Sequence, residues 1–222
     1  MIVWGGFDHQ PERAPLGATY DPLADHWRRT PSSPLPARQW HSAVWTGDEM
    51  IIWGGNDLVQ PPFADGAAYD PSTATWRQLP RAPIEGRYRH QALWTGKEMI
   101  VLGGQGFGFE FADGAAYDPD KNLWRTLPQS PLAARHWAST AWTGREMLVW
   151  GGYDDERVFR DGAAYNPTTG AWRRLPQAPI RGRCENSAVW TGTEFMLWGG
   201  TAACGSFGHR LADGAAYSPA DD

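Results

Sequence analysis

Hydrophobic and polar positions alternate in short runs along this chain, and the runs have the length of β-strands. Trp40–Trp45 and Met50–Trp53 are aromatic and β-branched runs separated by a polar tetrapeptide that contains Gly47. Two such runs joined by a Gly-containing turn indicate a β-hairpin. Gly66–Tyr69 and Trp76–Leu79 follow as two further strands, and a proline ends each of them within two residues. No stretch has the 3.6-residue period of an amphipathic helix, so the pattern predicts an all-β fold.

This four-strand pattern recurs about every 48 residues. Glycine pairs mark the repeats at intervals of 49, 49, 48 and 48 residues, at Gly5-Gly6, Gly54-Gly55, Gly103-Gly104, Gly151-Gly152 and Gly199-Gly200. A tyrosine follows each pair, and a tryptophan stands seven positions after each of the first four, giving Tyr20 and Trp27, Tyr69 and Trp76, Tyr117 and Trp124, and Tyr165 and Trp172. Four short strands in a period of this length are typical of propeller blades.

The glycine pair after the second strand, the tyrosine of the third and the tryptophan of the fourth together resemble the kelch motif. The resemblance covers almost the whole chain. It implies a single kelch-type β-propeller domain of about 4.5 to 5 four-stranded blades, with repeats at approximately residues 1–37, 38–86, 87–134, 135–182 and 183–222. The first strand of each blade is then expected nearest the axis and the fourth at the rim. The resemblance does not assign a function, because kelch propellers serve as enzymes, adaptors and binding scaffolds.

The two ends of the chain are out of phase with a closed ring. Met1–Gly6 aligns with Met50–Gly55, so the chain starts on the second strand of a blade, and it stops after a third strand that contains Tyr217. The strand count is therefore three, then three sets of four, then three, and we expect an incomplete ring. The chain is either a piece of a longer protein or a compact variant with three-stranded end blades. We favour the longer protein, because a missing inner strand leaves backbone groups near the axis unpaired.

Composition and charge exclude several classes of function. The 222 residues include 20 Lys and Arg against 25 Asp and Glu, a net charge of −5, so we expect no nucleic-acid partner. The longest apolar runs are far shorter than the ~18 residues of a membrane span, and the N-terminus lacks a basic region followed by an apolar stretch. We therefore expect a soluble chain with no membrane partner.

Residues that recur with the repeat are expected to be structural. Twelve of the 14 tryptophans recur in the first, second or fourth strand and are expected to pack between blades: Trp45, Trp94, Trp142, Trp190, Trp4, Trp53, Trp150, Trp198, Trp27, Trp76, Trp124 and Trp172. Recurrent arginines and glutamates are expected to form ion pairs or to bond backbone carbonyls, at Arg38, Arg87, Arg135, Arg183, Glu49, Glu98, Glu146 and Glu194. A ring of arginines that attracts an anion is the alternative. The recurrent Asp65, Asp113, Asp161 and Asp213 are expected to be turn residues.

Binding residues are expected where the repeats differ. Directly after the recurrent arginines, the copies read Gln39-Trp40-His41, Tyr88-Arg89-His90, His136-Trp137-Ala138 and Cys184-Glu185-Asn186. We take as candidate ligand-binding residues Trp40, His41, Tyr88, Arg89, His90, His136, Trp137, Glu185 and Asn186. The alternative role for Trp40 and Trp137 is to plug the axis.

The variable loops after the glycine pairs should lie on the same face as these triplets, where binding residues concentrate. They span Phe7–Leu16, Asn56–Ala64, Gln105–Ala112, Tyr153–Arg160 and Thr201–Ala212. Their aromatic and charged residues suit sugar stacking or peptide anchoring: Phe63, Phe107, Phe109, Phe111, Tyr153, Phe159, Phe207, Asp154, Asp155, Glu156, Arg157 and His209.

The two cysteines fall at the same end of the last blade. Cys184 opens its inner strand, and Cys204 lies in the loop after its glycine pair. They form either a disulfide, which would favour a secreted or periplasmic location, or two free thiols. The compartment stays open.

These observations favour a non-catalytic binding or scaffold module that recognises a protein, peptide or glycan through the loop face. The alternative is a carbohydrate-active kelch enzyme, either galactose oxidase-like or sialic acid epimerase-like. Copper oxidase chemistry needs two tyrosines, two histidines and a cysteine, and His41, His90, His136, Tyr88 and Cys184 are expected near the axis. No local string matches that family's copper motifs, and an epimerase-type acid–base pair could draw only on Glu185 and Arg89. We therefore predict no catalytic residue, no metal and no cofactor.

Overall fold

Short antiparallel strands build the whole of the described molecule, with no α-helix among residues 1–6, 17–204 and 209–219 of the computed structural model. The strands are β1 (Ile2–Trp4), β2 (Gly17–Asp21), β3 (His26–Arg29), β4 (Ser42–Trp45), β5 (Met50–Trp53), β6 (Gly66–Asp70), β7 (Thr75–Gln78), β8 (Gln91–Trp94), β9 (Met99–Leu102), β10 (Gly114–Asp118), β11 (Leu123–Thr126), β12 (Ser139–Trp142), β13 (Met147–Trp150), β14 (Gly162–Asn166), β15 (Ala171–Arg174), β16 (Ser187–Trp190), β17 (Phe195–Trp198) and β18 (Gly214–Tyr217). They form five sheets of three, four, four, four and three strands, which confirms the predicted all-β propeller and its incomplete ring.

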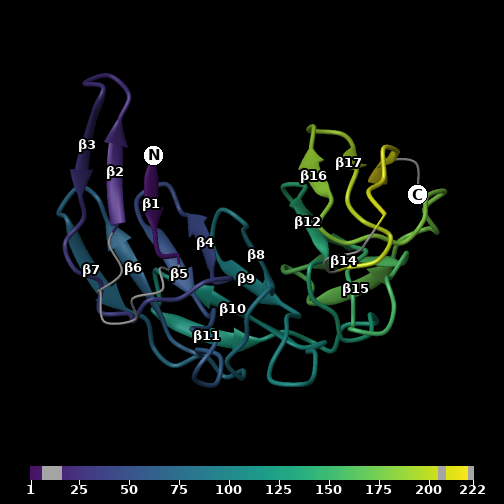
Figure 1. Ribbon diagram of the computed structural model, residues 1–222, viewed down its shortest axis with the longest axis horizontal. Helices are drawn as coiled ribbons and strands as arrows, with labels where there is room; N and C mark the ends of the chain where they lie inside the picture. The colour runs from purple at the N-terminus through teal and green to yellow at the C-terminus, as the bar shows by residue number, and fades with distance from the viewer. Residues whose placement is uncertain (7–16, 205–208, 220–222) are drawn as a thin grey trace.

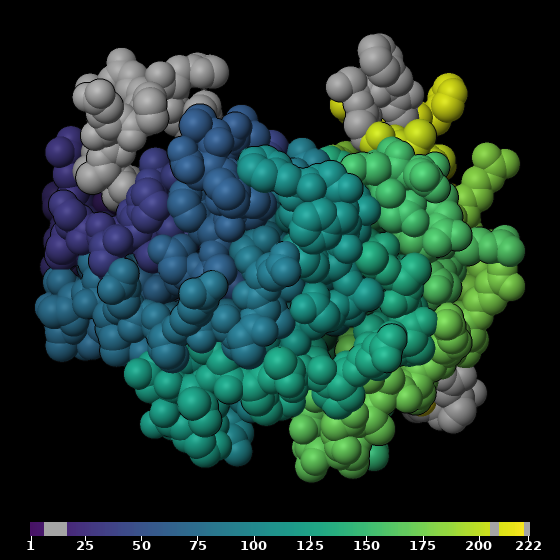
Figure 2. All heavy atoms as spheres, turned by 90° about the horizontal axis from the view of Figure 1, so that it is seen from below, coloured from purple at the N-terminus to yellow at the C-terminus, as the bar shows by residue number. Residues whose placement is uncertain are grey.

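The sheets stand side by side as blades in an open arc, with the first and last sheets at its two ends (Figure 1). The innermost strands β4, β8, β12 and β16 contact one another in sequence, so they surround the axis as expected. In the space-filling view, the blades follow one another around the molecule in chain order (Figure 2). The inner strands begin two residues later than predicted, at Ser42 in the second blade, because Trp40 has a φ of +54° and leaves the extended conformation.

Alternating side chains of each second strand fill the two sides of a blade. Ile51 and Trp53 pack toward the third blade, whereas Met50 and Ile52 pack toward the first. The positions equivalent to Trp53 and Ile52 are not buried at the ends of the arc, where Trp198 is 63% exposed and Val3 is 49% exposed. The end blades therefore present apolar faces of the kind that the inner blades bury.

The recurrent tryptophans of the fourth strands pack between blades and also donate hydrogen bonds there. The indole nitrogen of Trp124 donates to the carbonyl of Pro80 at 3.0 Å, and its ring lies 5.8 Å from that of Trp53 in the preceding blade. Trp76 and Trp172 donate in the same way to the carbonyls of Pro31 and Pro128, at 3.1 Å each. The fourth-strand tryptophans of the second, third and fourth blades thus pack as wedges between neighbouring blades.

The expectation that all twelve recurrent tryptophans are core is wrong at the ends of the arc. Trp27 is 48% exposed because it lies in the fourth strand of the first blade, on the side that no preceding sheet covers. Trp45 is also 48% exposed, and it lines a pocket of about 680 Å³ with Met1 and Ile2, beside a sheet that has no inner strand.

A buried arginine joins the first three strands of each of the last four blades. Arg87 has no exposed side-chain surface, and one guanidinium nitrogen donates to the carbonyl of Gly103 at 3.0 Å and to the Asp113 carboxylate at 2.8 Å. The ring of Phe111 lies 3.9 Å below the guanidinium. The carbonyl of Arg87 accepts a 2.8 Å bond from the backbone of Gly55, so the same residue links its blade to the preceding one.

The same arrangement recurs at Arg38 with Asp65, Arg135 with Asp161 and Arg183 with Asp213. The prediction that these aspartates are turn residues is wrong, since none lies in a turn: each directly precedes the third strand of its blade and pairs with the buried arginine. An anion-attracting arginine ring is excluded as well, because the guanidinium groups are buried and already bonded. The recurrent glutamates pair with a different set of arginines: Glu49 with Arg77, Glu98 with Arg125 and Glu146 with Arg173.

The glycine pairs are required by close backbone approach. Gly54 and Gly55 have φ values of +70° and +92°, and a Cβ on Gly55 would lie 2.7 Å from the carbonyl oxygen of Gln39. Side chains disfavour both the conformation and the contact, so the glycine pair lets the turn after the second strand lie against the start of the inner strand.

We expect Arg87→Met to lower the free energy of unfolding by about 3 kcal/mol, measured by urea denaturation. Methionine keeps much of the volume but leaves the buried carbonyl of Gly103 without its arginine donor and removes the ion pair with Asp113. Arg145→Met, in an exposed hairpin turn, should change the free energy by less than about 0.5 kcal/mol. Equal effects of the two substitutions would contradict the assigned role.

Candidate binding site at the axis

One residue from each of the last four blades adopts a left-handed backbone at the same point of the repeat. These residues are Trp40, Arg89, Trp137 and Glu185, with φ values of +54°, +56°, +54° and +56°. The backbone nitrogen of Arg89 donates to the carbonyl of Trp40, and that of Trp137 to the carbonyl of Arg89, each at 3.2 Å. Such a φ is uncommon for residues other than glycine, so the fold holds this turn against a conformational cost. The turns bring three of these side chains together at one end of the axis.

Arg89 lies between two tryptophan rings. Its guanidinium carbon is 4.2 Å from the ring centroid of Trp40 and 4.2 Å from that of Trp137. Tyr88 stacks on Trp40 with 5.6 Å between centroids. We call Trp40, Tyr88, Arg89 and Trp137 the axial cluster. Because Trp40 is 38% exposed, the cluster presents an aromatic and cationic surface to solvent as well as filling the end of the axis.

A chain of hydrogen bonds connects the axial cluster to the neighbouring loops. Arg89 donates to the amide oxygen of Gln105 at 3.0 Å, and the amide nitrogen of Gln105 donates to the Asp155 carboxylate at 2.9 Å. Burial lowers the pKa of Arg89, while the nearby Tyr88 and Asp155 act in the opposite direction. Three consecutive blades thus fix the position of one guanidinium group.

His136 lies beneath this cluster. It is 1% exposed, and its ring contacts the rings of Trp137 and Tyr153 edge-on at 4.9 and 5.4 Å. Glu110 and Asp155 approach it from the loops of two blades. Burial lowers the pKa of His136 to about 4.

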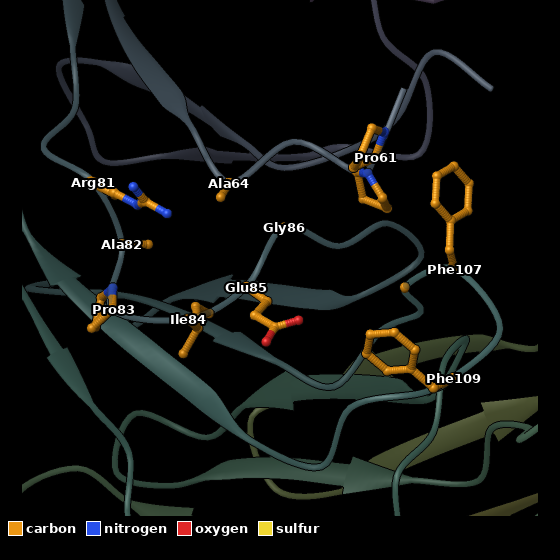
Figure 3. Close-up of a pocket in the computed structure, with 12 residues that line it drawn as sticks. Pro61, Ala64, Arg81, Ala82, Pro83, Ile84, Glu85, Gly86, Phe107 and Phe109 are labelled. Atoms are coloured by element: carbon orange, nitrogen blue, oxygen red, sulfur yellow. The ribbon is translucent and has the colours of Figure 1, made fainter. Parts of the chain in front are cut away.

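A small hairpin lies between the axial cluster and a groove on the same face. Gln105 and Glu110 pair at its base, and the backbone nitrogen of Gly106 donates to the carbonyl of Phe109 at 2.8 Å near its tip. Phe107 and Phe109 are 53% and 47% exposed. They line a groove of about 620 Å³ together with Pro61, Pro62, Ala64, Arg81, Ala82, Pro83, Ile84, Glu85, Gly86 and Gly106. Figure 3 shows both phenylalanine rings at one end of the groove and Arg81 at the other.

Two predicted site residues have structural positions instead. The rings of His41 and His90 pack edge-on against Trp4 and Trp53 of the preceding blades, at 5.2 Å in each case. His90 also shares a 2.8 Å hydrogen bond with the hydroxyl of Ser42. Burial lowers the pKa of His41 to about 4 and that of His90 to about 3.

The last blade contributes less than expected to the axial cluster. Glu185 is exposed, and the amide of Asn186 donates to the carbonyl of Ser187 at 3.3 Å. Cys184 and Cys204 form a disulfide, with 6.1 Å between their Cα atoms. The cysteine that copper oxidase chemistry would need is therefore already bonded in a disulfide.

Sequence reasoning did not single out Gln105 and Glu110. A signal for Gln105 exists, because the residue after each of the last four glycine pairs forms a bridge to the residue after a recurrent arginine, as Gln105 does with Tyr88 and Tyr153 with His136. Three predicted loop aromatics are not ligand-facing, since Phe63, Phe111 and Phe159 lie under the buried arginines. The loop Phe7–Leu16 and Phe207 lie outside the described residues.

No helix in the described part of the chain is long and apolar enough to cross a membrane. Blades around an axis, with variable loops gathered at one end, define the structure as a β-propeller. The chain belongs to the Kelch-repeat family, since residues 1–200 match the KLHDC2/KLHL20/DRC7 Kelch-repeats domain.

A solved structure described as "Structure of YjhT" has a similar fold. Its TM-score is 0.70 at 16% sequence identity, with 85% of this chain and 67% of that chain covered. At this identity the likeness shows the fold alone. No curated protein matches the sequence.

The buried histidine of the third blade makes stability depend on pH. The pKa of His90 is about 3 when folded, against an ordinary value of 6.5, so between these values the unfolded chain binds a proton that the folded chain does not. The free energy of unfolding therefore falls as the pH is lowered, by about 2 kcal/mol between pH 7 and pH 5 for this residue.

Urea denaturation at both pH values should show a smaller fall for His90→Asn than for the unmodified chain. Asparagine stands at the equivalent position of the last blade, as Asn186, so the substitution suits the fold. An equal fall in both proteins would contradict the assignment.

Proposed function

We propose that this Kelch propeller is a non-catalytic binding module that recognises an extended segment of a partner protein across its loop face. The observation that carries the proposal is the axial cluster, in which an arginine lies between two tryptophans that the repeat does not require. Aromatic residues and arginine are the side chains most enriched at the energetic centres of protein interfaces.

The geometry of the axial cluster suits a binding role. Neighbouring blades hold Arg89 in place, so little side-chain entropy remains to be lost when a ligand binds. Its charge suits polar or acidic groups of a ligand, and the exposed part of Trp40 suits an apolar group. A preformed surface of this kind binds without reorganisation of the scaffold.

The groove beside the axis supports a protein segment as the ligand. Its size and its aromatic and proline lining suit one or two apolar side chains, and Arg81 and Glu85 supply charges of both signs. The hairpin from Gln105 to Glu110 contributes to both places. One extended segment could therefore contact both, and Kelch domains generally mediate protein interactions.

A carbohydrate-active enzyme is less well supported. His41 and His90 pack between blades and Cys184 forms a disulfide, so the residues expected to resemble a copper oxidase site do not come together. A glycan ligand remains the alternative outcome of the first experiment below.

Peptides selected from a random display library on the immobilised chain should bind it with an affinity that depends on the axial cluster. We expect Trp40→Ala and Trp137→Ala each to weaken binding at least tenfold, because the substitutions remove an aromatic contact and free the guanidinium of Arg89. Calorimetry with one enriched peptide measures the change.

Trp45→Ala is the matched control, since Trp45 is also about half exposed but lies at the opposite end of its inner strand. Its binding should equal that of the unmodified chain. Failure to enrich any peptide, equal binding by all variants, or selective binding to a glycan array instead would each overturn the proposal.

The groove gives a second, independent prediction. Phe107→Ala combined with Phe109→Ala should weaken the same peptide about tenfold, because two exposed apolar surfaces are lost. Leu123→Ala, at a site 62% exposed in strand β11, should leave the affinity unchanged. If the double variant kept its affinity, the peptide would contact only the axial cluster and not the groove.

A further inference from the structure

Three chemically complementary side chains converge beneath the axial cluster. Nδ1 of His136 lies 3.8 Å from a carboxylate oxygen of Glu110, and Nε2 lies 3.9 Å from a carboxylate oxygen of Asp155. One ligand atom can be chosen from each residue so that all three lie within 4.8 Å of one another. We call these residues the acid–imidazole cluster.

The buried polar atoms of this cluster lack partners among the described residues. Neither ring nitrogen of His136 makes a hydrogen bond, although the side chain has no exposed surface, and a buried carboxylate oxygen of Glu110 has no partner either. A buried polar group without a partner costs about 1–3 kcal/mol. The histidine is therefore buried at a cost that a bound ligand would reduce.

The surrounding contacts orient the cluster. Gln105 holds one oxygen of Asp155 at 2.9 Å, which leaves the other oxygen facing His136. The rings of Trp137 and Tyr153 pack edge-on against the imidazole. In metal sites, outer-shell contacts of this kind hold the ligating carboxylates and imidazoles in fixed orientations.

A bound metal ion would draw the three ligand atoms closer together. Ligand atoms about 2.0–2.2 Å from a tetrahedral ion are separated by roughly 3.4 Å. One ion can bind only one ring nitrogen of His136, and the separations of 3.8 and 3.9 Å start from different nitrogens. The three ligand atoms available to one ion lie within 4.8 Å of one another, so a separation must shorten by up to about 1.4 Å. Asp155 is 56% exposed, so it can move and also offers an entry path from solvent.

The donor set identifies the class of ion. An imidazole nitrogen with two carboxylate oxygens suits Zn²⁺ and similar transition metals, whereas Ca²⁺ and Mg²⁺ prefer oxygen ligands alone. Like charges on Glu110 and Asp155 repel when both are ionised, and a divalent cation would neutralise them. Three protein ligands would leave one position open toward the loop face.

We propose that Glu110, His136 and Asp155 form a binding site for one divalent transition-metal ion of the Zn²⁺ class. The site lies beneath the axial cluster and does not depend on the protein-binding role proposed above. Because its ligands come from two loops and from the segment that precedes strand β12, a bound ion would join the third and fourth blades.

Calorimetric titration of the chelator-treated full chain with ZnCl₂ tests this site. We expect uptake of one Zn²⁺ per chain and a rise in the melting temperature that increases with Zn²⁺ concentration. CaCl₂ at the same concentrations should produce neither effect. Absence of stoichiometric Zn²⁺ uptake, or equal uptake of Ca²⁺, would overturn the proposal.

Substitutions then locate the ion. His136→Gln should weaken Zn²⁺ binding at least tenfold and abolish the rise in melting temperature, and the substitution suits the fold because the second blade carries Gln39 at this position. Glu110→Gln and Asp155→Asn should each weaken binding at least tenfold and retain the native far-ultraviolet circular dichroism spectrum. His26→Gln, at an exposed histidine of strand β3, should leave binding unchanged. Undiminished binding by His136→Gln would place the ion elsewhere and contradict the inference.

Discussion

The network around the buried arginine that precedes each inner strand is the interaction on which the rest of this structure depends. Burying a guanidinium group is costly unless its donors are satisfied. Here Arg87 bonds the carbonyls and the carboxylate that surround the end of its own second strand, while its own carbonyl accepts a bond from the preceding blade. A charge-assisted network therefore fixes the inner edge of the blade and its junction with a neighbour together.

That anchoring also explains why the candidate site is ordered. Arg87 precedes Tyr88 and Arg89 directly, so the residue held most firmly in the repeat is followed at once by those that vary. The left-handed turn at Arg89 is maintained because the backbone is fixed on both sides, by the buried arginine and by strand β8. Variable side chains can thus project toward the axis without weakening the blade that carries them.

The sequence predicted the fold in most of its detail, because each blade repeats the same landmarks. Strand β5 was predicted at its observed bounds, and the three-stranded end blades followed from the phase of Met1 and Tyr217. The buried ion pairs were predicted less well. Arg38 is closer in sequence to Glu49 than to Asp65, yet the glutamate lies at the far end of the hairpin, where it meets Arg77. Proximity along the chain does not reveal which end of a strand a side chain occupies.

The alignment of the repeats predicted only part of the candidate site. That alignment selected Trp40, Arg89 and Trp137 as unrequired residues, but it placed His41 and His90 with them, because packing against Trp4 and Trp53 cannot be inferred from spacing. Gln105 and Glu110 were missed because their contacts cross between loops of different blades.

The second, third and fourth blades each supply one residue to the bonded series Trp40, Arg89 and Trp137, so the order of these blades is itself part of the surface chemistry. Inserting a repeat after the second or third blade would preserve every strand pairing but would separate the cation from one of its aromatic neighbours. Adding a repeat beyond either end would leave all three in contact. Such an arc can therefore be lengthened at its ends without loss of the axial cluster, whereas a repeat inserted within it would disrupt the cluster.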